Sequence, residues 1–420
     1  MQRRIFASIA VFAAAAVVTG LPSSPGASQT GPAAPPPGFK VAFIGDQGLA
    51  AEAGAVLQLI EDEGADMALH LGDFGYGDEQ DPQTAVAWDA QISSVLGQDF
   101  PYFGVAGNHD VDTWSTYQGL LVDLNRVPGA ACSGDYGVMA ACSYQGLSFL
   151  LSGIGTIPDQ PDDATHVSYL SSQLAADDSV WRICSWHKNQ NAMQLGDKPD
   201  EVGWGAYEAC RTGRAIIATA HEHSYGRTKT LSSMQNQTVD PAWPNGGQLR
   251  VEPGSTFAFV SGLGGRSIRD QERCLPSTPP YGCQGEWASI YTDAQGADYG
   301  ALFIEFHVDG DPAKARGYFK NIAGATVDSF TITSSVAGGS GPPTPTATAT
   351  PTPTRTPTPG GAVGGSVEVV PPRLPPARAA DAPADRWPVV AVTIAGLTVV
   401  VVGTALTAGA LLRRRAGHCS

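Results

Sequence analysis

The sequence predicts a mixed α/β fold, and three observations support this prediction. Between residues 40 and 223, short apolar runs rich in β-branched and aromatic residues alternate with helical segments. Such alternation is typical of βαβ units in a sheet that is covered by helices. After Phe257 the pattern changes to strands with few helices, which predicts a second, largely antiparallel sheet. No linker-like composition interrupts the chain before Ser335, so we expect a single body.

The elements are expected in the following order. In the first half, apolar β-rich runs predict strands within residues 40–46, 66–73, 101–110, 147–153, 180–187 and 214–223. Helical patterns between these runs cover residues 50–64, 84–96, 164–176 and 202–211. In the second half, strands are expected within residues 257–265, 300–308, 316–322 and 329–333.

Both ends of the chain differ from this body, which spans residues 38–334. Residues 1–30 begin with two arginines, continue through an apolar run and become proline-rich, as in a secretory signal peptide. Residues 387–412 are 26 residues without a charge and precede three arginines, which predicts a transmembrane helix with residues 413–420 in the cytoplasm. Residues 335–386 include a Thr/Pro repeat and are expected to form a disordered stalk. We therefore expect an exported protein, anchored in the cell membrane by a single C-terminal helix with its body outside.

The charge of the body is strongly negative. Residues 31–342 contain 16 Lys and Arg and 37 Asp and Glu, a net charge of −21. Such a field repels polyanions, so no nucleic-acid binding is expected. Part of the acidic surplus is available for binding cations, although a solvated acidic surface is the more common explanation.

Six of the seven cysteines precede the predicted anchor. An even number of cysteines in an oxidising compartment favours disulfides. The short spacings favour Cys132 with Cys142 and Cys274 with Cys283, which leaves Cys184 for Cys210. Other pairings of six cysteines stay open at this point.

Side chains that bind metals follow the carboxyl ends of five expected strands. They are Asp46, Asp73, Asn108, His187, His221 and His223. Open α/β sheets build their ligand sites from loops at this edge. One aspartate after a strand is more often a turn residue or helix cap. Its repetition along the chain instead favours a metal site.

The motifs that contain these residues occur in a characteristic order. "GDQG", "GDFGY", "GNHD", "SWH" and "AHEHSYGR" together make residues 40–325 resemble the calcineurin-like metallophosphoesterases, and among them the purple acid phosphatases. The resemblance implies a four-layer αββα sandwich with two mixed β-sheets flanked by helices. It also implies hydrolysis of phosphate monoesters by in-line attack of a metal-bound hydroxide at a two-metal centre.

The same resemblance implies how the metals are held. Asp73 stands at the position that bridges both ions, and Asn108, His187 and His221 stand at those of the second. That second ion is expected to be divalent Fe, Zn or Mn. The first motif lacks the usual histidine, because it reads Asp46-Gln47-Gly48. Purple acid phosphatases fill this gap with a tyrosine three residues after the bridging aspartate, the position of Tyr76. Fe(III) is therefore expected at Asp46, Tyr76 and His223.

Residues beyond the ligands have expected roles in turnover. The resemblance places His109 beside the substrate phosphate, where it can donate a proton to the leaving oxygen. Lys188, Tyr225 and Arg227 are expected to bind substrate. His221 and His223 are expected on an extended strand end, where alternate side chains share one face and Glu222 points away. A histidine cluster that follows the position of His187 in the family is missing here, and "KNQNAMQ" stands in its place.

Three functions remain open from the sequence. A phosphomonoesterase for a small phosphate ester is the leading interpretation. A phosphodiesterase or nucleotide hydrolase would use the same ligands, since the walls of the cleft select the substrate. A non-catalytic surface binding module is the third, and the presence of all seven ligand positions argues against it. The oligomeric state is not indicated by the sequence.

Overall fold

The computed structural model describes residues 33–157 and 162–335. The predicted signal peptide (1–30), the stalk beyond Ser335, the transmembrane helix (387–412) and the tail (413–420) lie outside the described residues, so these remain predictions. Within the described ranges, no helix combines the length and apolar character needed to cross a membrane.

One layer of the fold is a mixed sheet of seven strands. Its order is β12 (Gln248–Val251), β17 (Thr326–Ser334), β16 (Lys314–Asn321), β15 (Gly300–Phe306), β1 (Phe39–Ile44), β2 (Met67–His70) and β3 (Tyr102–Gly104). β1, β2 and β3 are parallel, whereas β15, β16 and β17 are antiparallel to their sequence neighbours. β15 pairs antiparallel with β1 and so joins the two sets.

The second layer is a mixed sheet of eight strands. Its order is β14 (Trp287–Tyr291), β9 (Tyr225–Thr228), β13 (Ala258–Ser261), β8 (Ile216–Thr219), β7 (Trp181–Ser185), β6 (Leu147–Ser152), β5 (Met139–Tyr144) and β4 (Ala131–Asp135). The four central strands β6, β7, β8 and β13 are parallel. A separate ladder joins β10 (Leu231–Ser233) to β11 (Thr238–Val239).

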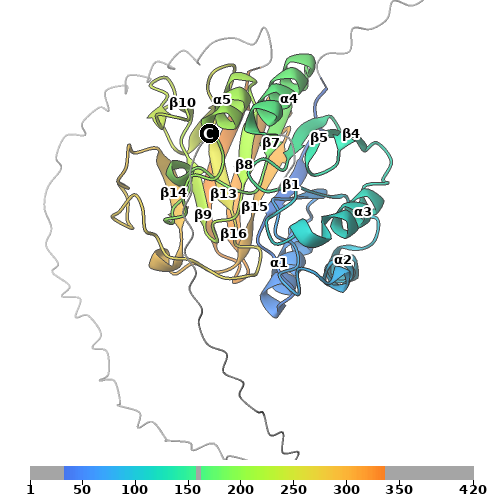
Figure 1. Ribbon diagram of the computed structural model, residues 1–420. Helices are drawn as coiled ribbons and strands as arrows, with labels where there is room; N and C mark the ends of the chain where they lie inside the picture. Colours follow the sequence, from blue (N-terminus) through green and yellow to red (C-terminus); the bar gives the residue numbers. More distant parts are fainter. Residues whose placement is uncertain (1–32, 158–161, 336–420) are drawn as a thin grey trace, which may run out of the picture. The chain divides into compact units, whose positions relative to one another are not determined.

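Helices cover the outer face of each sheet (Figure 1). α1 (Ala51–Asp62), α2 (Pro82–Leu96) and α3 (Trp114–Leu124) lie with the seven-stranded sheet, where α1 contacts β15 and α3 contacts β3. α4 (Asp163–Ala176) and α5 (Trp204–Thr212) lie on the eight-stranded sheet, against β6 and β8. Short 3₁₀ turns occupy Val111–Thr113, Asn191–Met193 and Asp293–Gln295. The predicted αββα sandwich is therefore confirmed.

Aromatic side chains fill the space between the two sheets. Phe43 of β1 meets Phe259 of β13 edge to face, with ring centroids 5.2 Å apart. Tyr225 of β9 stacks on Phe319 of β16 at 4.3 Å. All four side chains are buried. Burying one large apolar side chain stabilises a fold by about 1.5–3 kcal/mol, so this layer holds the sheets face to face.

The division of strands between the sheets differs from the prediction. The sequence pattern assigned the strands after Phe257 to a separate, largely antiparallel sheet. Instead, β15–β17 extend the sheet of β1–β3, while β13 extends the sheet of β6–β8. The pattern also missed α3, the β4–β5 hairpin, β9–β12 and β14. The reason is that apolar periodicity reports burial and does not identify the neighbour with which a strand pairs.

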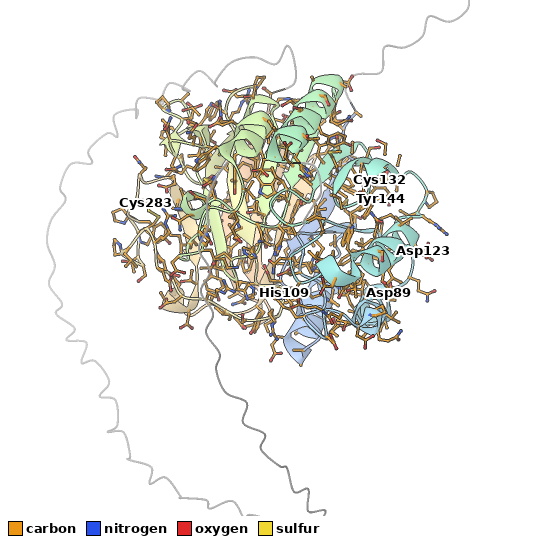
Figure 2. All side chains as sticks on the ribbon, in the orientation of Figure 1. Asp89, His109, Asp123, Cys132, Tyr144 and Cys283 are labelled. Atoms are coloured by element: carbon orange, nitrogen blue, oxygen red, sulfur yellow. A yellow bond between two sulfur atoms is a disulfide. The ribbon has the colours of Figure 1, made fainter. Side chains whose placement is uncertain are left out.

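The favoured disulfide pairing is confirmed. Cys132 and Cys142 are directly opposite in the β4–β5 hairpin, and Cys184 of β7 is bonded to Cys210 of α5. Cys274 and Cys283 close a loop before β14. Figure 2 shows Cys132 and Cys283 on opposite sides of the domain, with His109 between them on another part of the surface. The disulfides therefore fasten separate regions and do not crowd the site described next.

Candidate metal centre

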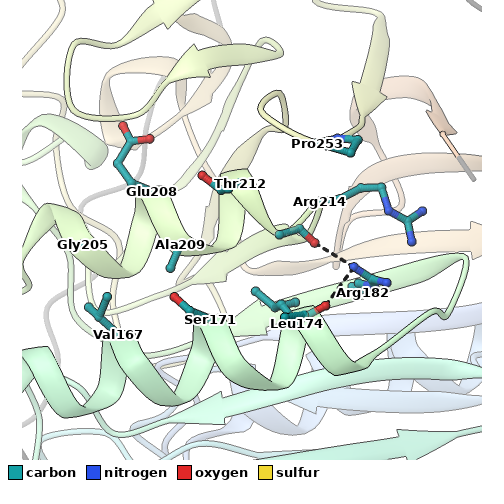
Figure 3. A pocket seen from close by; sticks show the side chains of 12 residues that line it. Val167, Ser171, Leu174, Arg182, Gly205, Glu208, Ala209, Thr212, Arg214 and Pro253 are labelled. Atoms are coloured by element: carbon teal, nitrogen blue, oxygen red, sulfur yellow. Dashed lines mark hydrogen bonds between the residues drawn. The ribbon is translucent and has the colours of Figure 1, made fainter. Parts of the chain in front are cut away.

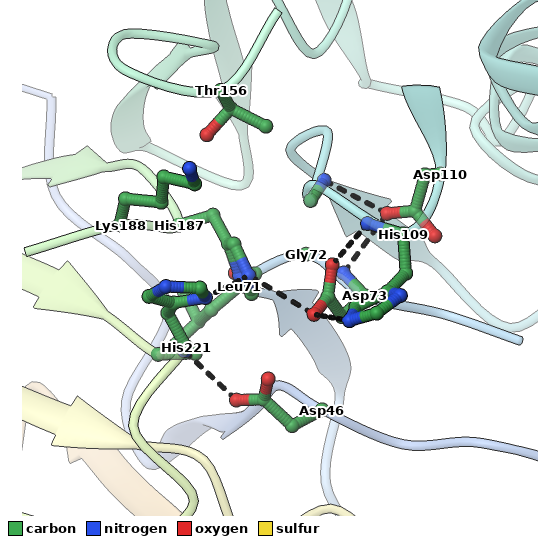
Figure 4. A network of polar contacts seen from close by, with 12 residues as sticks. Asp46, Leu71, Gly72, Asp73, His109, Asp110, Thr156, His187, Lys188 and His221 are labelled. Atoms are coloured by element: carbon green, nitrogen blue, oxygen red, sulfur yellow. Dashed lines mark hydrogen bonds and ion pairs between the residues drawn. The ribbon is translucent and has the colours of Figure 1, made fainter. Parts of the chain in front are cut away.

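Loops after β1, β2, β3, β7 and β8 bring the predicted ligands together. Six of the seven form an unbroken set of polar contacts: Asp46, Asp73, Tyr76, His187, His221 and His223. The seventh, Asn108, stands directly before His109, whose backbone N–H donates to Asp73 Oδ1 at 2.9 Å. Figure 4 shows Asp73 at the middle of this network, between His187 and His109.

The first group converges on the phenolic oxygen of Tyr76. This oxygen lies 2.8 Å from Asp46 Oδ1, 2.7 Å from Asp73 Oδ2 and 3.0 Å from His223 Nε2. Two carboxylates, a phenol and an imidazole nitrogen therefore surround one point. Tyr76, which was expected to replace the histidine missing from the first motif, thus lies among the other expected ligands of the first metal.

The second group lies on the other side of Asp73. His187 Nε2 is 3.2 Å from Asp73 Oδ2 and 3.1 Å from His221 Nδ1. Asp73, His187 and His221 form a buried cluster in which one ligand atom of each lies within 4.8 Å of the others. Asp73 thus contacts members of both groups, as a bridging carboxylate must.

Each of the three histidines has a polar contact on its outer side. His187 Nδ1 lies 2.8 Å from the Leu71 carbonyl oxygen, and His221 Nε2 lies 2.8 Å from Glu201 Oε2. The Leu71 carbonyl only accepts, so His187 Nδ1 is the donor and His187 Nε2 faces inward. His223 Nδ1 is 2.5 Å from Ser267 Oγ. This outer hydrogen bonding fixes the tautomer and orientation of histidines that ligate metals.

The donor set fits a two-cation centre. The inward nitrogens of His187 and His221 face each other at 3.1 Å. Burial would lower the pKa of His187, but the neighbouring Asp73 carboxylate outweighs it and raises that pKa to about 9, so positive charge is favoured at this point. The carboxylates of Asp46 and Asp73 are almost completely buried, which is costly without compensating positive charge. Asn108 Oδ1 is also buried and, within the described residues, has no hydrogen-bond partner. Carboxylate, amide and imidazole donors suit divalent and trivalent first-row metals.

The protonation of the ligands depends strongly on their surroundings. Burial alone would raise the pKa of Asp73, but the neighbouring His187 outweighs it and lowers that pKa to about 2. Burial and the two carboxylates raise the pKa of Tyr76 well above its ordinary value. Tyr76 is therefore a neutral phenol in the protein alone, and only nearby positive charge would favour its phenolate.

The backbone at the centre is tightly constrained. Asp46, Asp73, Tyr76 and His221 all have φ between 50° and 67°, a left-handed conformation that residues other than glycine rarely adopt. Such strain is concentrated at functional sites. Gly107 allows the loop after β3 to approach, since a Cβ there would lie 2.2 Å from Asp73 Oδ1.

The turn from His221 to His223 is not an extended strand end, as the sequence had suggested. β8 ends at Thr219, and His221 has a φ of 67°. The amide N–H groups of Glu222 and Ser224 donate to carbonyls two residues earlier, at 2.8 and 2.7 Å. Both histidines still reach the centre because the chain folds back on itself. Glu222 is buried away from the ligand atoms, 3.4 Å from Arg269.

His109 lies at the open side of the centre. Its side chain is 37% exposed, and its Nε2 is 4.0 Å from Asp73 Oδ2. Its Nδ1 is 2.5 Å from Glu79 Oε1. The carboxylate of Glu79 accepts this hydrogen bond and directs Nε2 toward the ligands. The sequence reasoning missed Glu79, since it stands in a loop with no motif of its own.

Lys188 is engaged by a second residue that the sequence reasoning missed. Its Nζ lies 2.9 Å from Glu201 Oε1, while the other oxygen of Glu201 lies 2.8 Å from His221 Nε2. Glu201 thus orients a predicted ligand and neutralises the lysine that was expected to bind substrate. The only sequence signal for Glu201 was its acidic side chain before the helix pattern at 202–211.

Tyr225 and Arg227, which were expected to bind substrate, do not face the candidate metal centre. Both side chains are buried on β9 and bind Asp328 of β17. Arg227 Nε and Nη2 donate to the two oxygens of Asp328 at 2.7 and 3.0 Å. Because β9 and β17 belong to different sheets, these residues join the two layers of the sandwich. The physical reason is that the chain enters the inter-sheet core directly after Ser224.

A cavity of about 530 Å³ lies elsewhere, between α4 and α5 (Figure 3). Its lining is largely apolar and includes Val167, Leu174 and Pro253. Arg182 at its edge donates to the carbonyls of Leu174 and Gly213. No predicted site residue lines this cavity, so it is separate from the candidate metal centre.

Comparison with known proteins agrees with this geometry. Residues 39–225 match the family model of the calcineurin-like phosphoesterases. This match confirms the predicted metallophosphoesterase domain over these residues. Members of this family hydrolyse phosphoric esters. No curated protein matches the chain.

One solved structure shows the same fold, and two others are less similar. A purple acid phosphatase, PPD1 from yellow lupin (Lupinus luteus) seeds, is similar with a TM-score of 0.51 and 19% identity, over 71% of this chain and 55% of that chain. The match therefore covers only about half of the length of the lupin protein. PhoD has a TM-score of 0.46 and 12% identity, over 73% of this chain and 74% of its own. GAP50, the anchor in the inner membrane complex of Plasmodium, has a TM-score of 0.45 and 12% identity, over 71% and 89%.

Proposed function

We propose that this chain is a phosphomonoesterase of the purple acid phosphatase type with a binuclear metal centre. The observation that supports the proposal most is the pair of ligand groups that share Asp73. On one side the Tyr76 oxygen, Asp46 and His223 converge, and on the other His187 and His221 face each other. Family membership supplies the reaction class.

The residues present indicate which cations they would hold. Asp46, Tyr76 and His223 would hold Fe(III), because a phenolate is a hard anionic donor. Asn108, His187 and His221 would hold a divalent Fe, Zn or Mn ion, with Asp73 shared. Two cations at these positions would supply positive charge for the phosphoryl oxygens and would acidify the attacking water.

The chain's own groups complete the reaction. Water adds to phosphorus, the bond from phosphorus to the ester oxygen breaks, and the leaving oxygen takes a proton. His109 Nε2 delivers that proton, and Glu79 holds the opposite nitrogen at 2.5 Å. The exposed position of His109 leaves room for a leaving group outside the centre. Both products, inorganic phosphate and an alcohol, then diffuse away.

The proposed location is the outer face of the cell membrane. Three disulfides in the described residues are consistent with an oxidising compartment. The signal-peptide and transmembrane patterns predicted from the sequence add the export and the single anchor. A small phosphate ester is the proposed partner, and the acidic body disfavours nucleic acid.

The experiment is metal analysis of the purified chain together with a panel of phosphate monoesters, diesters and nucleotides. Wild type should contain two metal ions and hydrolyse monoesters fastest. Asp73→Ala should lose metal and activity together, whereas His109→Ala should keep the metals and lose turnover by about 10²–10⁴-fold. Asp99→Ala, which removes an exposed carboxylate elsewhere, is the matched control.

Three results would contradict the proposal. Bound metal without hydrolysis of any ester would indicate a binding module. Faster hydrolysis of diesters or nucleotides would replace the monoesterase assignment. Loss of metal in His109→Ala would show that this residue belongs to the ligands.

A further inference from the structure

The loop after β13, residues 262–270, is built directly onto the candidate metal centre. Gly264 N–H donates to the Gly45 carbonyl at 3.0 Å, and Arg266 N–H donates to the Asp46 carbonyl at 3.0 Å. Ser267 Oγ contacts His223 Nδ1. The backbone of this loop is therefore fixed relative to two of the expected ligands, Asp46 and His223.

The close approach of the loop depends on a glycine. A Cβ at Gly262 would lie 2.7 Å from Asp46 Oδ2 and 2.2 Å from the Glu222 carbonyl oxygen. Any other residue would push the loop away from both. Because the loop lies this close to Asp46, its next exposed side chain, Arg266, lies at the edge of the centre.

Arg266 differs from Lys188, another cation beside the centre. Its guanidinium lies over the Tyr76 ring, 4.9 Å from the ring centroid. Within residues 33–157 and 162–335, no acidic side chain forms an ion pair with Arg266, whereas Lys188 is paired with Glu201 at 2.9 Å. An exposed arginine without a counter-ion, in a strongly acidic body, retains its full charge for an incoming anion.

The position of Arg266 indicates which part of a substrate it meets. The Tyr76 ring that it covers also contacts the His109 imidazole, with ring centroids 4.5 Å apart. His109 is the proposed proton donor to the leaving oxygen. Arg266 and His109 therefore border the side of the centre where the leaving group departs, while Lys188 stands beside His221 on the other side.

We propose that Arg266 determines specificity by binding a second anionic group on the leaving group. The substrates are then phosphate monoesters whose leaving group carries a carboxylate or a second phosphate ester group. The planar guanidinium binds either anion through two parallel hydrogen bonds. This inference rests on the proposed phosphoesterase function, and it adds the charge of the leaving group to it.

The test compares two esters that differ in one charge, 4-carboxyphenyl phosphate and the methyl ester of its carboxylate. Full-length wild type should show a higher kcat/KM for the carboxylate. Arg266→Gln should reduce this preference about threefold to tenfold, through KM, with a larger loss on the carboxylate than on the methyl ester. Arg266→Lys should restore part of the preference. Arg126→Gln, an equal change of charge at a 74% exposed site on α3's end, is the matched control.

A binding measurement separates recognition from turnover. By calorimetry, phosphonoacetate should bind wild type more tightly than ethylphosphonate, and this difference should shrink in Arg266→Gln. An unchanged preference in Arg266→Gln would overturn the inference while leaving the phosphoesterase function intact. Equal losses on both esters would also overturn it, because Arg266 would then act on the transferred phosphate. If wild type hydrolyses neither ester, both proposals fail.

Discussion

The substitution Asp328→Ala tests whether the ion pair between Asp328 and Arg227 holds the two sheets together. Asp328 accepts from Arg227 Nε and Nη2 at 2.7 and 3.0 Å and from the Tyr225 hydroxyl at 2.7 Å. Asp328→Ala removes all these acceptors and leaves a buried guanidinium without a counter-charge. Burial alone would lower the pKa of Arg227, but Asp328 outweighs it and raises that pKa. Without Asp328 this pKa falls, but a guanidinium does not lose its proton in proteins, so Arg227 stays charged in the variant.

The expected loss of stability follows from these contacts. Removing one partner of a buried ion pair costs about 3–5 kcal/mol. Arg227 Nη1 keeps its bonds to the carbonyls of Thr228 and Gly246, at 3.2 and 2.8 Å. We therefore expect the free energy of unfolding to fall by about 3 kcal/mol, the lower end of that range. Guanidinium chloride titration followed by tryptophan fluorescence measures the loss.

Activity measured well below the unfolding transition separates a structural role from a substrate role. If Arg227 and Tyr225 only join the sheets, KM should be unchanged in Asp328→Ala. Asp309→Ala is the matched control, because it breaks an exposed pair with Arg316 at 3.8 Å and should cost at most about 1 kcal/mol. A raised KM with unchanged stability would refute the structural assignment.

Three further predictions concern Tyr76 and Glu201 at the candidate metal centre and Glu63 outside it. After reconstitution with iron, wild type should absorb visible light through tyrosinate-to-iron charge transfer, and Tyr76→Phe should lose the band while keeping the ring. Glu201→Gln should weaken metal binding about 10- to 100-fold, measured by chelator competition, because His221 loses its outer carboxylate. Burial would raise the pKa of Glu63, but Lys320 and Tyr318 outweigh it and lower that pKa. Its stabilising effect is thus complete above about pH 4.3 and lost as the pH falls through the folded pKa, so Glu63→Gln should flatten that part of the pH–stability curve.

Each of these has a contrary result. A visible band of equal strength in Tyr76→Phe would show that the Tyr76 phenol does not bind the first metal. Equal metal affinities of wild type and Glu201→Gln in chelator competition would show that Glu201 does not support metal binding through His221 and only pairs with Lys188. Parallel pH–stability curves for wild type and Glu63→Gln would show that the Lys320 contact contributes nothing, and Glu61→Gln, an exposed neighbour on α1, controls for the loss of charge.

The candidate ligands could be predicted because each follows a short apolar run. Asp46 and Asp73 come directly after buried strands with a glycine before them, so local pattern alone placed them at the sheet edge. The missing histidine of the first motif and the tyrosine after Asp73 were also both visible in the sequence. By contrast, Glu79, Glu201 and Arg266 stand in loops, where no periodicity marks a residue that will turn toward the centre.

The sequence by itself determined the alternation of the main strands and helices, the ligand types at the strand ends and a preference for the three cysteine pairs. These follow from properties of short segments: burial period, turn residues and spacing. Only the tertiary structure decided that β15 pairs with β1, that Arg227 faces Asp328, and that Arg266 covers Tyr76. Such contacts join residues far apart in the chain, as Asp46 Oδ2 and the His221 N–H are, 175 residues from each other. Which distant segments meet depends on how whole sheets pack, because many pairings would satisfy the same local pattern of burial.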